Sequence, residues 1–390
     1  MSTFARATQS ENGALSAARS VLRRLLETES VSGVIVDIAS TGPGIPHRRL
    51  VRDPEQIERA LPFAPVILTS GARLASQVTD RRVAPGPERP QKPPTAIVLR
   101  PCEAKAAVEL AKLRQVDPHQ VLIVAVDCVG THEASDFSEL GVAAEAWAEE
   151  YLGRLREGAA DSSDVRAYRA ACSRCVDAAA PVADLWLHVV GVPEADGVLV
   201  EVSDPALAER LGLDVVEDPP QRAPVLGQLR DQRSAKRAQD LEAALQSLQP
   251  GAGGTPGLAE LFDTCLRCLN CGTACPICYC KECLFRTDSV KVEPRHLLDL
   301  AERRGAVRLP GDAILYQLTR LMHVSMSCVG CGMCASACPM DLPVDLVFQA
   351  VGRETQTLLA YAPGFDPAQP IPVSTFERDE FESLGEHSPR

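Results

Sequence analysis

The first 200 residues alternate between helix-like and strand-like spacing of apolar residues. A helix is predicted where apolar side chains recur every three or four positions, at Leu15, Ala18, Leu22 and Leu25. Short apolar runs predict strands at 33–38, 66–69, 96–99, 121–126 and 197–202. Between the third and fourth runs, a second helical face carries Ala106, Ala107, Leu110 and Leu113. Because near-continuous apolar runs are typical of parallel strands covered on both faces, this order predicts a βαβ unit within an α/β domain.

The pattern changes after residue 215. A charged helical stretch at 226–248 ends in a Pro/Gly-rich run, 249–257, which is typical of a flexible linker. The chain is then helical and rich in cysteine as far as Gly364, and the remainder is rich in Pro and Glu. We therefore predict four segments: an α/β domain at 1–215, a charged helix with linker at 216–257, a cysteine-rich helical domain at 258–365, and a disordered tail at 366–390.

The charge balance limits the range of partners. Lys and Arg number 40 against 52 Asp and Glu, which gives a net charge of −12, and aromatic residues make up 4% of the chain. An acidic surface repels phosphate backbones and anionic lipid, so we expect no nucleic acid as partner and no membrane insertion. The opening residues do not resemble a signal peptide, and no apolar run approaches the length of a membrane span. We therefore expect a cytoplasmic protein.

Fifteen cysteines provide the candidate chemistry. In a reducing compartment their clustering favours metal over disulfides. Two runs share the spacing Cys-x-x-Cys-x-x-Cys-x-x-x-Cys-Pro: Cys265, Cys268, Cys271 and Cys275, then Cys328, Cys331, Cys334 and Cys338. In two-cluster ferredoxins, three cysteines of one run and the fourth of the other hold each [4Fe–4S] cluster. We therefore assign Cys265, Cys268, Cys271 and Cys338 to one cluster, and Cys328, Cys331, Cys334 and Cys275 to the other.

The segment between the runs predicts a helical setting for them. It contains 52 residues, with Ile314, Leu318 and Leu321 at helical spacing, which suggests an α-helical ferredoxin-type domain. The alternative of two structural zinc sites predicts separated Cys-x-x-Cys pairs instead. Three further cysteines, Cys278, Cys280 and Cys283, lack a fourth ligand nearby. They could exchange with ligands of the first run, form a small extra metal site, or pack as polarizable thiols beside a cluster.

Four cysteines lie in the predicted α/β domain. Cys102 and Cys128 follow strands 96–99 and 121–126, so both are expected at the carboxyl edge of the sheet, where ligands of open α/β sheets gather. The pair Cys172 and Cys175 could complete a four-thiolate site there. Two buried core cysteines and an incidental pair are an equally good interpretation of the spacing.

Three segments of this domain resemble a known family. Residues 96–110, 124–131 and 171–177, which contain these four cysteines, are similar to the beta-subunit family of deazaflavin-reducing hydrogenases and formate dehydrogenases. The resemblance covers about residues 10 to 205, and the cysteine-rich extension resembles that of the formate dehydrogenase members. It implies a third [4Fe–4S] cluster held by Cys102, Cys128, Cys172 and Cys175, and one FAD. The family's flavin stretch is matched in part by residues 11–17, which implies contacts from Asn12, Gly13 and Ser16, with Thr131 nearby.

These features predict a flavin and iron–sulfur oxidoreductase subunit. A deazaflavin or nicotinamide coenzyme would exchange hydride with FAD, which converts electron pairs into single electrons. The clusters would relay them to a hydrogenase, formate dehydrogenase or disulfide-reductase partner. We assign no catalytic residue, because hydride transfer requires no acid–base side chain. Arg100 and Lys105 could neutralise a flavin or coenzyme phosphate, or could be ordinary solvated surface.

Two other functions fit the same residues. The chain could be a non-catalytic electron-transfer subunit that has no flavin, since the flavin stretch matches only partly. It could also be a scaffold stabilised by zinc within a larger complex, in which case metal analysis would find zinc without acid-labile sulfide.

Overall fold

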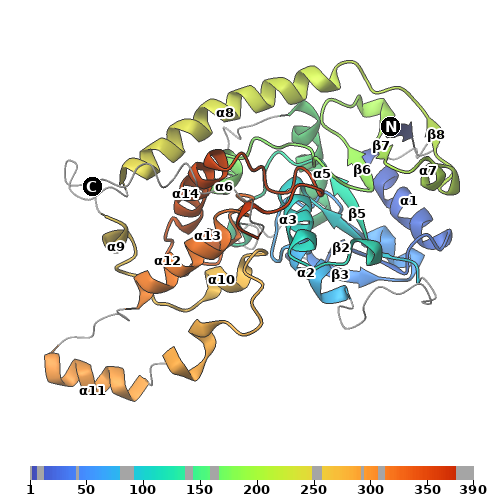
Figure 1. Cartoon of the computed structure of the whole chain (residues 1–390). Helices are drawn as coiled ribbons and strands as arrows, with labels where there is room; N and C mark the ends of the chain where they lie inside the picture. The colour runs from blue at the N-terminus through green and yellow to red at the C-terminus, as the bar shows by residue number, and fades with distance from the viewer. Residues whose placement is uncertain are drawn as a thin grey trace.

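The computed structural model describes residues 2–6, 13–40, 44–79, 92–136, 144–158, 167–247, 257–290, 294–305 and 312–374. Within these residues the protein is mixed α/β, with one sheet of strand order β3-β2-β4-β5-β6-β7-β1-β8 (Figure 1). The strands are β1 (Thr3–Arg6), β2 (Gly33–Ile38), β3 (His47–Val51), β4 (Thr95–Leu99), β5 (Val121–Val126), β6 (Leu185–His188), β7 (Leu199–Val202) and β8 (Asp214–Val215). The helices around this sheet are α1 (Gly13–Glu27), α2 (Gly71–Val78), α3 (Pro101–Lys112), α5 (Ala144–Glu157), α6 (Ala170–Ser173) and α7 (Pro205–Arg210).

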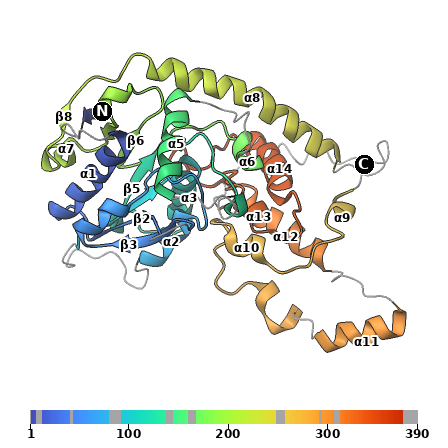
Figure 2. The ribbon, with the colours of Figure 1, turned by 180° about the vertical axis from the view of Figure 1, so that it is seen from behind.

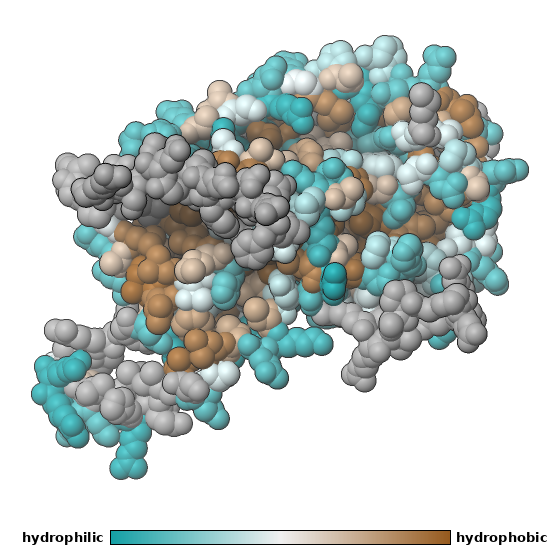
Figure 3. Space-filling model, viewed as in Figure 1, coloured by the Kyte–Doolittle hydropathy of each residue, from teal (hydrophilic) through white to brown (hydrophobic). Residues whose placement is uncertain are grey.

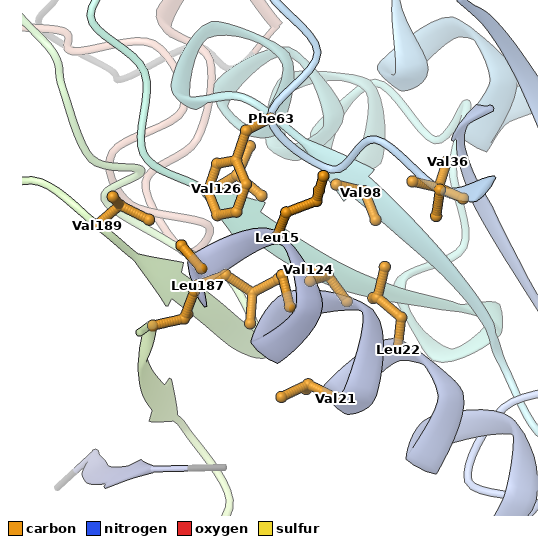
Figure 4. Packing of buried hydrophobic residues seen from close by; sticks show 14 of the residues in the cluster. Leu15, Val21, Leu22, Val36, Phe63, Val98, Val124, Val126, Leu187 and Val189 are labelled. Atoms are coloured by element: carbon orange, nitrogen blue, oxygen red, sulfur yellow. The ribbon is translucent and has the colours of Figure 1, made fainter. Parts of the chain in front are cut away.

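The central strands are parallel and buried on both faces. Strands β2, β4, β5 and β6 pair in parallel, with Ile97 opposite Ile123 across β4 and β5. Alternate side chains of β4 point to opposite layers: Val98 packs in the core that contains α1, and Ile97 in the core that contains α3. Figure 4 shows Leu15 and Leu22 of α1 against Val98 and Val124 of the sheet. The apolar runs in the sequence therefore reflect coverage by helices on both sides.

Most predicted elements of the first half are present, with one exception. The apolar run at 66–69 forms no strand, because only Val66 makes an isolated bridge, to His132. It lies in a connection that leads to α2, in which Val66 and Ile67 are buried and Leu68 is 44% exposed. The predicted strand at 197–202 is shorter at its start, since β7 begins at Leu199.

The cysteine-rich half is helical in its described residues. It contains α9 (Leu258–Leu261), α10 (Asn270–Ala274), α11 (Pro294–Arg304), α12 (Ala313–Val324), α13 (Met333–Ser336) and α14 (Val344–Leu358). It shares one hydrophobic cluster with the sheet layer: Ile97 and Ala107 belong to the same cluster as Tyr316 and Phe348. The two halves of the chain are therefore packed on a common core.

A long charged helix spans both halves. Helix α8 (Arg222–Ser247) runs from the sheet to α14, as the views from both sides show (Figures 1 and 2). Near its end, Leu241 and Ala244 pack against Ala350 of α14. The predicted Pro/Gly linker lies mostly outside the described residues. Of the predicted tail, residues 366–374 are described, and Ile371 is buried against Met326 and Tyr361.

The surface of the cysteine-rich half carries apolar side chains on one face. Figure 3 shows them gathered over the region of α12, whose exposed apolar residues are Leu315, Leu318 and Met322. Among the described residues, no helix combines the length and the apolar character that crossing a bilayer requires.

Candidate functional site

The four cysteines of the α/β half line a single cavity, which we call the N-terminal cavity. Cys102 lies in the first turn of α3, directly after β4, and Cys128 lies two residues after β5. Cys172 lies in α6, and Cys175 follows it with its amide N–H bonded to the Cys172 carbonyl at 3.0 Å. Of the two interpretations of their spacing, convergence at the carboxyl edge of the sheet is the one that this arrangement favours.

Several polar groups approach the sulfurs of this cavity. The Tyr151 hydroxyl lies 3.8 Å from Cys128 Sγ, and Arg169 Nη2 and Thr131 Oγ1 each lie 3.5 Å from Cys172 Sγ. Burial by itself would raise the pKa of Cys172, but the Arg169 guanidinium and the hydrogen bonds from Thr131 bring it below the usual value for a thiol. The pKa of Cys175 rises to about 11, because burial disfavours its thiolate and Asp177 adds a like charge. The cavity therefore favours the anionic form most at Cys172.

The two C-terminal runs line two further cavities. The outer cavity is lined by Cys265, Cys268, Cys271 and Cys338, and the Cys268 side chain is exposed. The middle cavity is lined by Cys275, Cys328, Cys331 and Cys334. Each cavity thus brings together three cysteines of one run and the fourth of the other, which is the grouping that we assigned from the sequence. Their role as cluster ligands stays a prediction. In the described part of the chain, no group of three or more His, Cys, Asp or Glu residues is arranged to hold a metal ion.

The two runs have left-handed residues at equivalent positions. Arg267 and Leu269 have φ values of +53° and +64°, and Gly330 and Gly332, at the equivalent positions of the second run, both have φ of +71°. Alternation between right-handed and left-handed conformations turns successive N–H groups toward one point, and this arrangement recurs at anion and Fe–S sites. In the first run non-glycine residues adopt it, so the loop is held by its surroundings at some conformational cost.

The three cavities form a series. Gly330 and Cys331 line both the N-terminal and the middle cavity. A Cβ at Gly332 would lie 2.3 Å from the Cβ of Ala171, so α6 and the second run are in direct contact. The middle and outer cavities lie along the same helix, α12. Its Arg320 and Val324 line the middle cavity, and its Tyr316 and Gln317 line the outer cavity.

The residues expected at a flavin are not brought together as one group. Asn12 lies outside the described residues. Gly13 begins α1 with φ of +85° and open space around its missing Cβ, and Ser16 follows in the first turn. Figure 4 places Leu15 of this turn beside Phe63 and Val126, at the edge of the sheet where Cys128 follows β5. The start of α1 and the N-terminal cavity therefore lie at the same edge.

The two basic residues expected near a phosphate are buried and paired. Arg100 lies 3.3 Å from Glu103 and 3.7 Å from Asp37, and Lys105 Nζ lies 2.5 Å from Asp177. Neither belongs to the solvated surface. Thr131 is also buried, and its hydroxyl accepts a hydrogen bond from Arg169 Nε at 2.9 Å.

The three remaining cysteines lie beside the cavities without lining any of them. Cys278 and Cys283 are half-buried, and Cys280 is exposed. A Cβ on Gly272 would lie 3.6 Å from Cys278 Sγ, so this thiol packs behind the short helix α10 that carries Cys271.

Several functional candidates were missed in the sequence. Arg169, Arg233, Tyr316, Gln317 and Arg320 all line a cavity that contains cysteines. Gln317 Nε2 lies 3.7 Å from Cys265 Sγ, and Tyr316 Oη lies 3.7 Å from Cys271 Sγ. Arg169 could have been noticed because it lies one turn before Cys172. The others come from α8 and α12, whose sequence spacing gives no sign of a site.

Comparison with known proteins gives relatives over most of the chain. No protein-family model matches. The F420-dependent formate dehydrogenase subunit beta of Methanocaldococcus jannaschii is 25% identical over 336 residues, which cover 79% of this chain and 80% of that protein. The predicted resemblance to that family is confirmed. The F420-dependent formate dehydrogenase 1 subunit beta of Methanococcus maripaludis is 24% identical, over 78% of this chain and 84% of its own length.

The similarity to these beta subunits also bears out the prediction of an oxidoreductase subunit. Among solved structures, a chain of the F420-reducing [NiFe] hydrogenase complex from Methanosarcina barkeri aligns with a TM-score of 0.40 and 15% identity. The alignment covers 62% of this chain and 91% of that chain.

Proposed function

We propose that this chain is the flavin and iron–sulfur subunit of an F420-linked oxidoreductase. In this function it exchanges hydride between a deazaflavin coenzyme and FAD, and relays single electrons to a larger redox subunit. The observation that carries the proposal is the series of three cavities, each lined by its own set of four cysteines, in which the N-terminal and middle cavities also share Gly330 and Cys331 of the second run. Contiguous sites of this kind suit the transfer of electrons through the protein.

The donor sets fit [4Fe–4S] clusters. Such a cluster takes four thiolates, and each cavity offers four cysteines, from two segments in the middle and outer cavities and from three in the N-terminal cavity. Buried donors also remain without partners: within the described residues, Nε of Arg233 in the N-terminal cavity and Nε of Arg320 in the middle cavity have no hydrogen-bond partner. Cluster sulfur would accept hydrogen bonds from such groups. We therefore assign Cys102, Cys128, Cys172 and Cys175 to one cluster, and retain the sequence-based assignment for the other two.

The similarity to F420-dependent formate dehydrogenase beta subunits supports the coenzyme and partner classes. F420 is a deazaflavin that carries electrons in pairs, whereas clusters carry them singly, so a flavin is needed to convert one into the other. The start of α1 could present its free N–H groups to a flavin pyrophosphate. The partner would be a formate dehydrogenase, hydrogenase or disulfide-reductase subunit.

The proposal is tested on protein isolated anaerobically. We expect about twelve iron atoms with matching acid-labile sulfide, and a flavin spectrum that bleaches when reduced F420 is added. Cys102→Ser should lose about four iron atoms, because one of four thiolates of the N-terminal cavity is missing. Cys280→Ser is the matched control, since this exposed cysteine lines none of the three cavities, and it should keep all of its iron. Zinc in place of iron and sulfide would refute the proposal.

A second function, electron transfer without flavin, is favoured by one observation. Arg100 and Lys105, the basic residues available for a phosphate, are already paired with buried carboxylates. Twelve iron atoms without flavin, and no reduction of the clusters by reduced F420, would support this second function over the first.

A further inference from the structure

Two buried arginines distinguish the N-terminal cavity from the others. Arg169 and Arg233 both line it and are 4% and 3% exposed. Arg169 donates hydrogen bonds to Thr131, Cys172, Ser336 and the Cys331 carbonyl, and Arg233 donates to the carbonyls of Val129 and Cys175. Neither arginine forms an ion pair with a carboxylate in the described part of the chain. The half-buried Glu133 is linked to Arg169 through the Ser336 hydroxyl.

The other charges near this cavity cancel one another, except that of Glu133, which offsets part of the charge of Arg169. Asp37 and Glu103 are matched by Arg48 and Arg100 in one buried network. Lys105 is matched by Asp177 at 2.5 Å. The N-terminal cavity therefore has a surplus of positive charge that comes from Arg169 and Arg233.

The surplus of positive charge decreases from the N-terminal cavity through the middle cavity to the outer cavity. In the middle cavity, Arg320 is buried and unpaired by any carboxylate within the described residues, whereas Asp345 is neutralised by Arg174 at 2.5 Å. In the outer cavity the charged lining residue is Arg267, which pairs with Asp312 at 2.5 Å. The outer cavity thus has no surplus charge among its described lining residues.

Hydrogen bonds to sulfur do not distinguish the two ends. Tyr151, Thr131 and Arg169 approach sulfurs of the N-terminal cavity. Gln317 approaches two sulfurs of the outer cavity, and Tyr316 approaches one of them. The main difference between the ends is therefore charge and exposure.

One-electron reduction of a cluster adds one negative charge to it. A nearby buried cation stabilises that charge, and its effect is large where water is excluded. Solvent at the exposed Cys268 also favours the reduced state of the outer cluster. This effect opposes that of the surplus positive charge, which favours reduction of the N-terminal cluster. Arg233 and Arg169, the latter partly offset by Glu133, act where water is excluded, so we expect their effect on the potentials to exceed that of the hydration at Cys268.

We infer that Arg169 and Arg233 give the cluster of the N-terminal cavity the most positive reduction potential of the three, with the outer cluster the most negative. This inference rests on the proposed function. An electron that enters at the outer cavity from a partner subunit then moves downhill to the N-terminal cavity, next to the edge of the sheet where α1 begins. Equilibrium therefore favours flow toward reduction of the coenzyme. The two arginines act through the cluster and are positioning residues.

The test is a redox titration of the holoprotein followed by electron paramagnetic resonance. The signal of the N-terminal cluster is identified by its loss in Cys102→Ser. We expect this signal to have the highest midpoint potential. Arg169→Gln and Arg233→Gln should each shift it to a more negative value while the signal of the outer cluster stays in place.

Two controls separate charge from packing. Arg169→Lys keeps the positive charge but loses the planar guanidinium. The midpoint potential of the N-terminal cluster should therefore stay close to that of the wild type. Lys236→Gln removes an exposed charge from α8, one turn after Arg233, and should shift nothing, because solvent screens it. Should Arg169→Gln fail to fold, Arg233→Gln provides the same measurement from helix α8, whereas Arg169 precedes α6.

Two results would overturn the inference: an N-terminal midpoint potential below that of the outer cluster, or unchanged potentials in both glutamine variants. Each requires iron to be present in the wild type. Protein without iron would instead refute the proposed function, so the two failures are distinguishable.

Discussion

Arg169 and Cys331 join the two halves of the protein, because Nη2 of Arg169 donates a hydrogen bond to the Cys331 carbonyl at 3.2 Å. The same guanidinium bonds to Thr131 at 2.9 Å and to Cys172 Sγ at 3.5 Å. The planar guanidinium of arginine holds its N–H donors in one plane and can bond to several acceptors at once, which the ammonium of a lysine could not do. The N-terminal and middle cavities are therefore held together by one residue that bonds to both.

The ion pair between Arg174 and Asp345 should matter for stability. Both side chains are buried, and their charged atoms are 2.5 Å apart. Arg174→Ala would leave the Asp345 carboxylate buried without its partner, so we expect a loss of about 3–5 kcal/mol in the free energy of unfolding. Denaturant unfolding measures this loss. Arg154→Ala, which breaks an exposed pair with Glu150, is the control and should cost less than about 1 kcal/mol.

Gly332 should tolerate no side chain. Its φ of +71° is unfavourable for other residues, and an added Cβ would lie 2.3 Å from Ala171. Gly332→Ala is therefore expected to lower the unfolding free energy by about 1–3 kcal/mol and to disturb the contact between α6 and the second cysteine run. Gly153→Ala is the matched control. This position lies in α5 with open space around it, so the same change should stabilise the helix by about 1 kcal/mol. Equal effects at both positions would contradict this account.

His188 should make stability depend on pH above neutrality. Burial by itself would lower the pKa of His188, but Asp127 and Glu201, each 2.9 Å from a ring nitrogen, raise it above its usual value. A raised pKa in the folded state means that the stabilisation is complete below about pH 6.5 and is lost as the pH rises through the folded pKa. The unfolding free energy of the wild type should therefore fall as the pH rises above about 6.5, over the range in which folded His188 releases its proton.

His188→Gln provides the comparison for that titration, because it removes the titrating ring. The variant should lose most of the pH dependence in this interval. A wild-type curve that is flat or rises there would show that His188 is neutral in the folded protein.

Cys278, Cys280 and Cys283 should be dispensable for iron binding. None of them lines the three cavities within the described residues, and Cys280 is exposed. The triple replacement by Ser should keep the iron and sulfide content, with a modest loss of stability because Cys278 and Cys283 pack against the core. Iron and sulfide analysis measures the outcome. A loss of about four iron atoms would show that these thiols hold a cluster.

The sequence by itself determined which cysteines group together within each C-terminal cavity. The spacing of Cys265 to Cys275 and of Cys328 to Cys338 restricts each run to a short turn, so three sulfurs face one point and the fourth is displaced. The buried strands were also predictable, because parallel strands covered on both faces need continuous apolar runs. The run at 66–69 does not follow this rule: Val66 makes one isolated bridge, Val66 and Ile67 are buried in a connection, and Leu68 is exposed.

Only the tertiary structure decided the order of the cavities and which residues other than cysteine line them. Arg169, Arg233 and Arg320 reach the cysteines from three different helices or loops, with no regular spacing to them along the chain. The contact of Ala171 with Gly332 likewise joins positions 161 residues apart. Local spacing is fixed by covalent geometry, whereas such long-range contacts depend on how the sheet, α8 and the cysteine-rich helices pack on their common core.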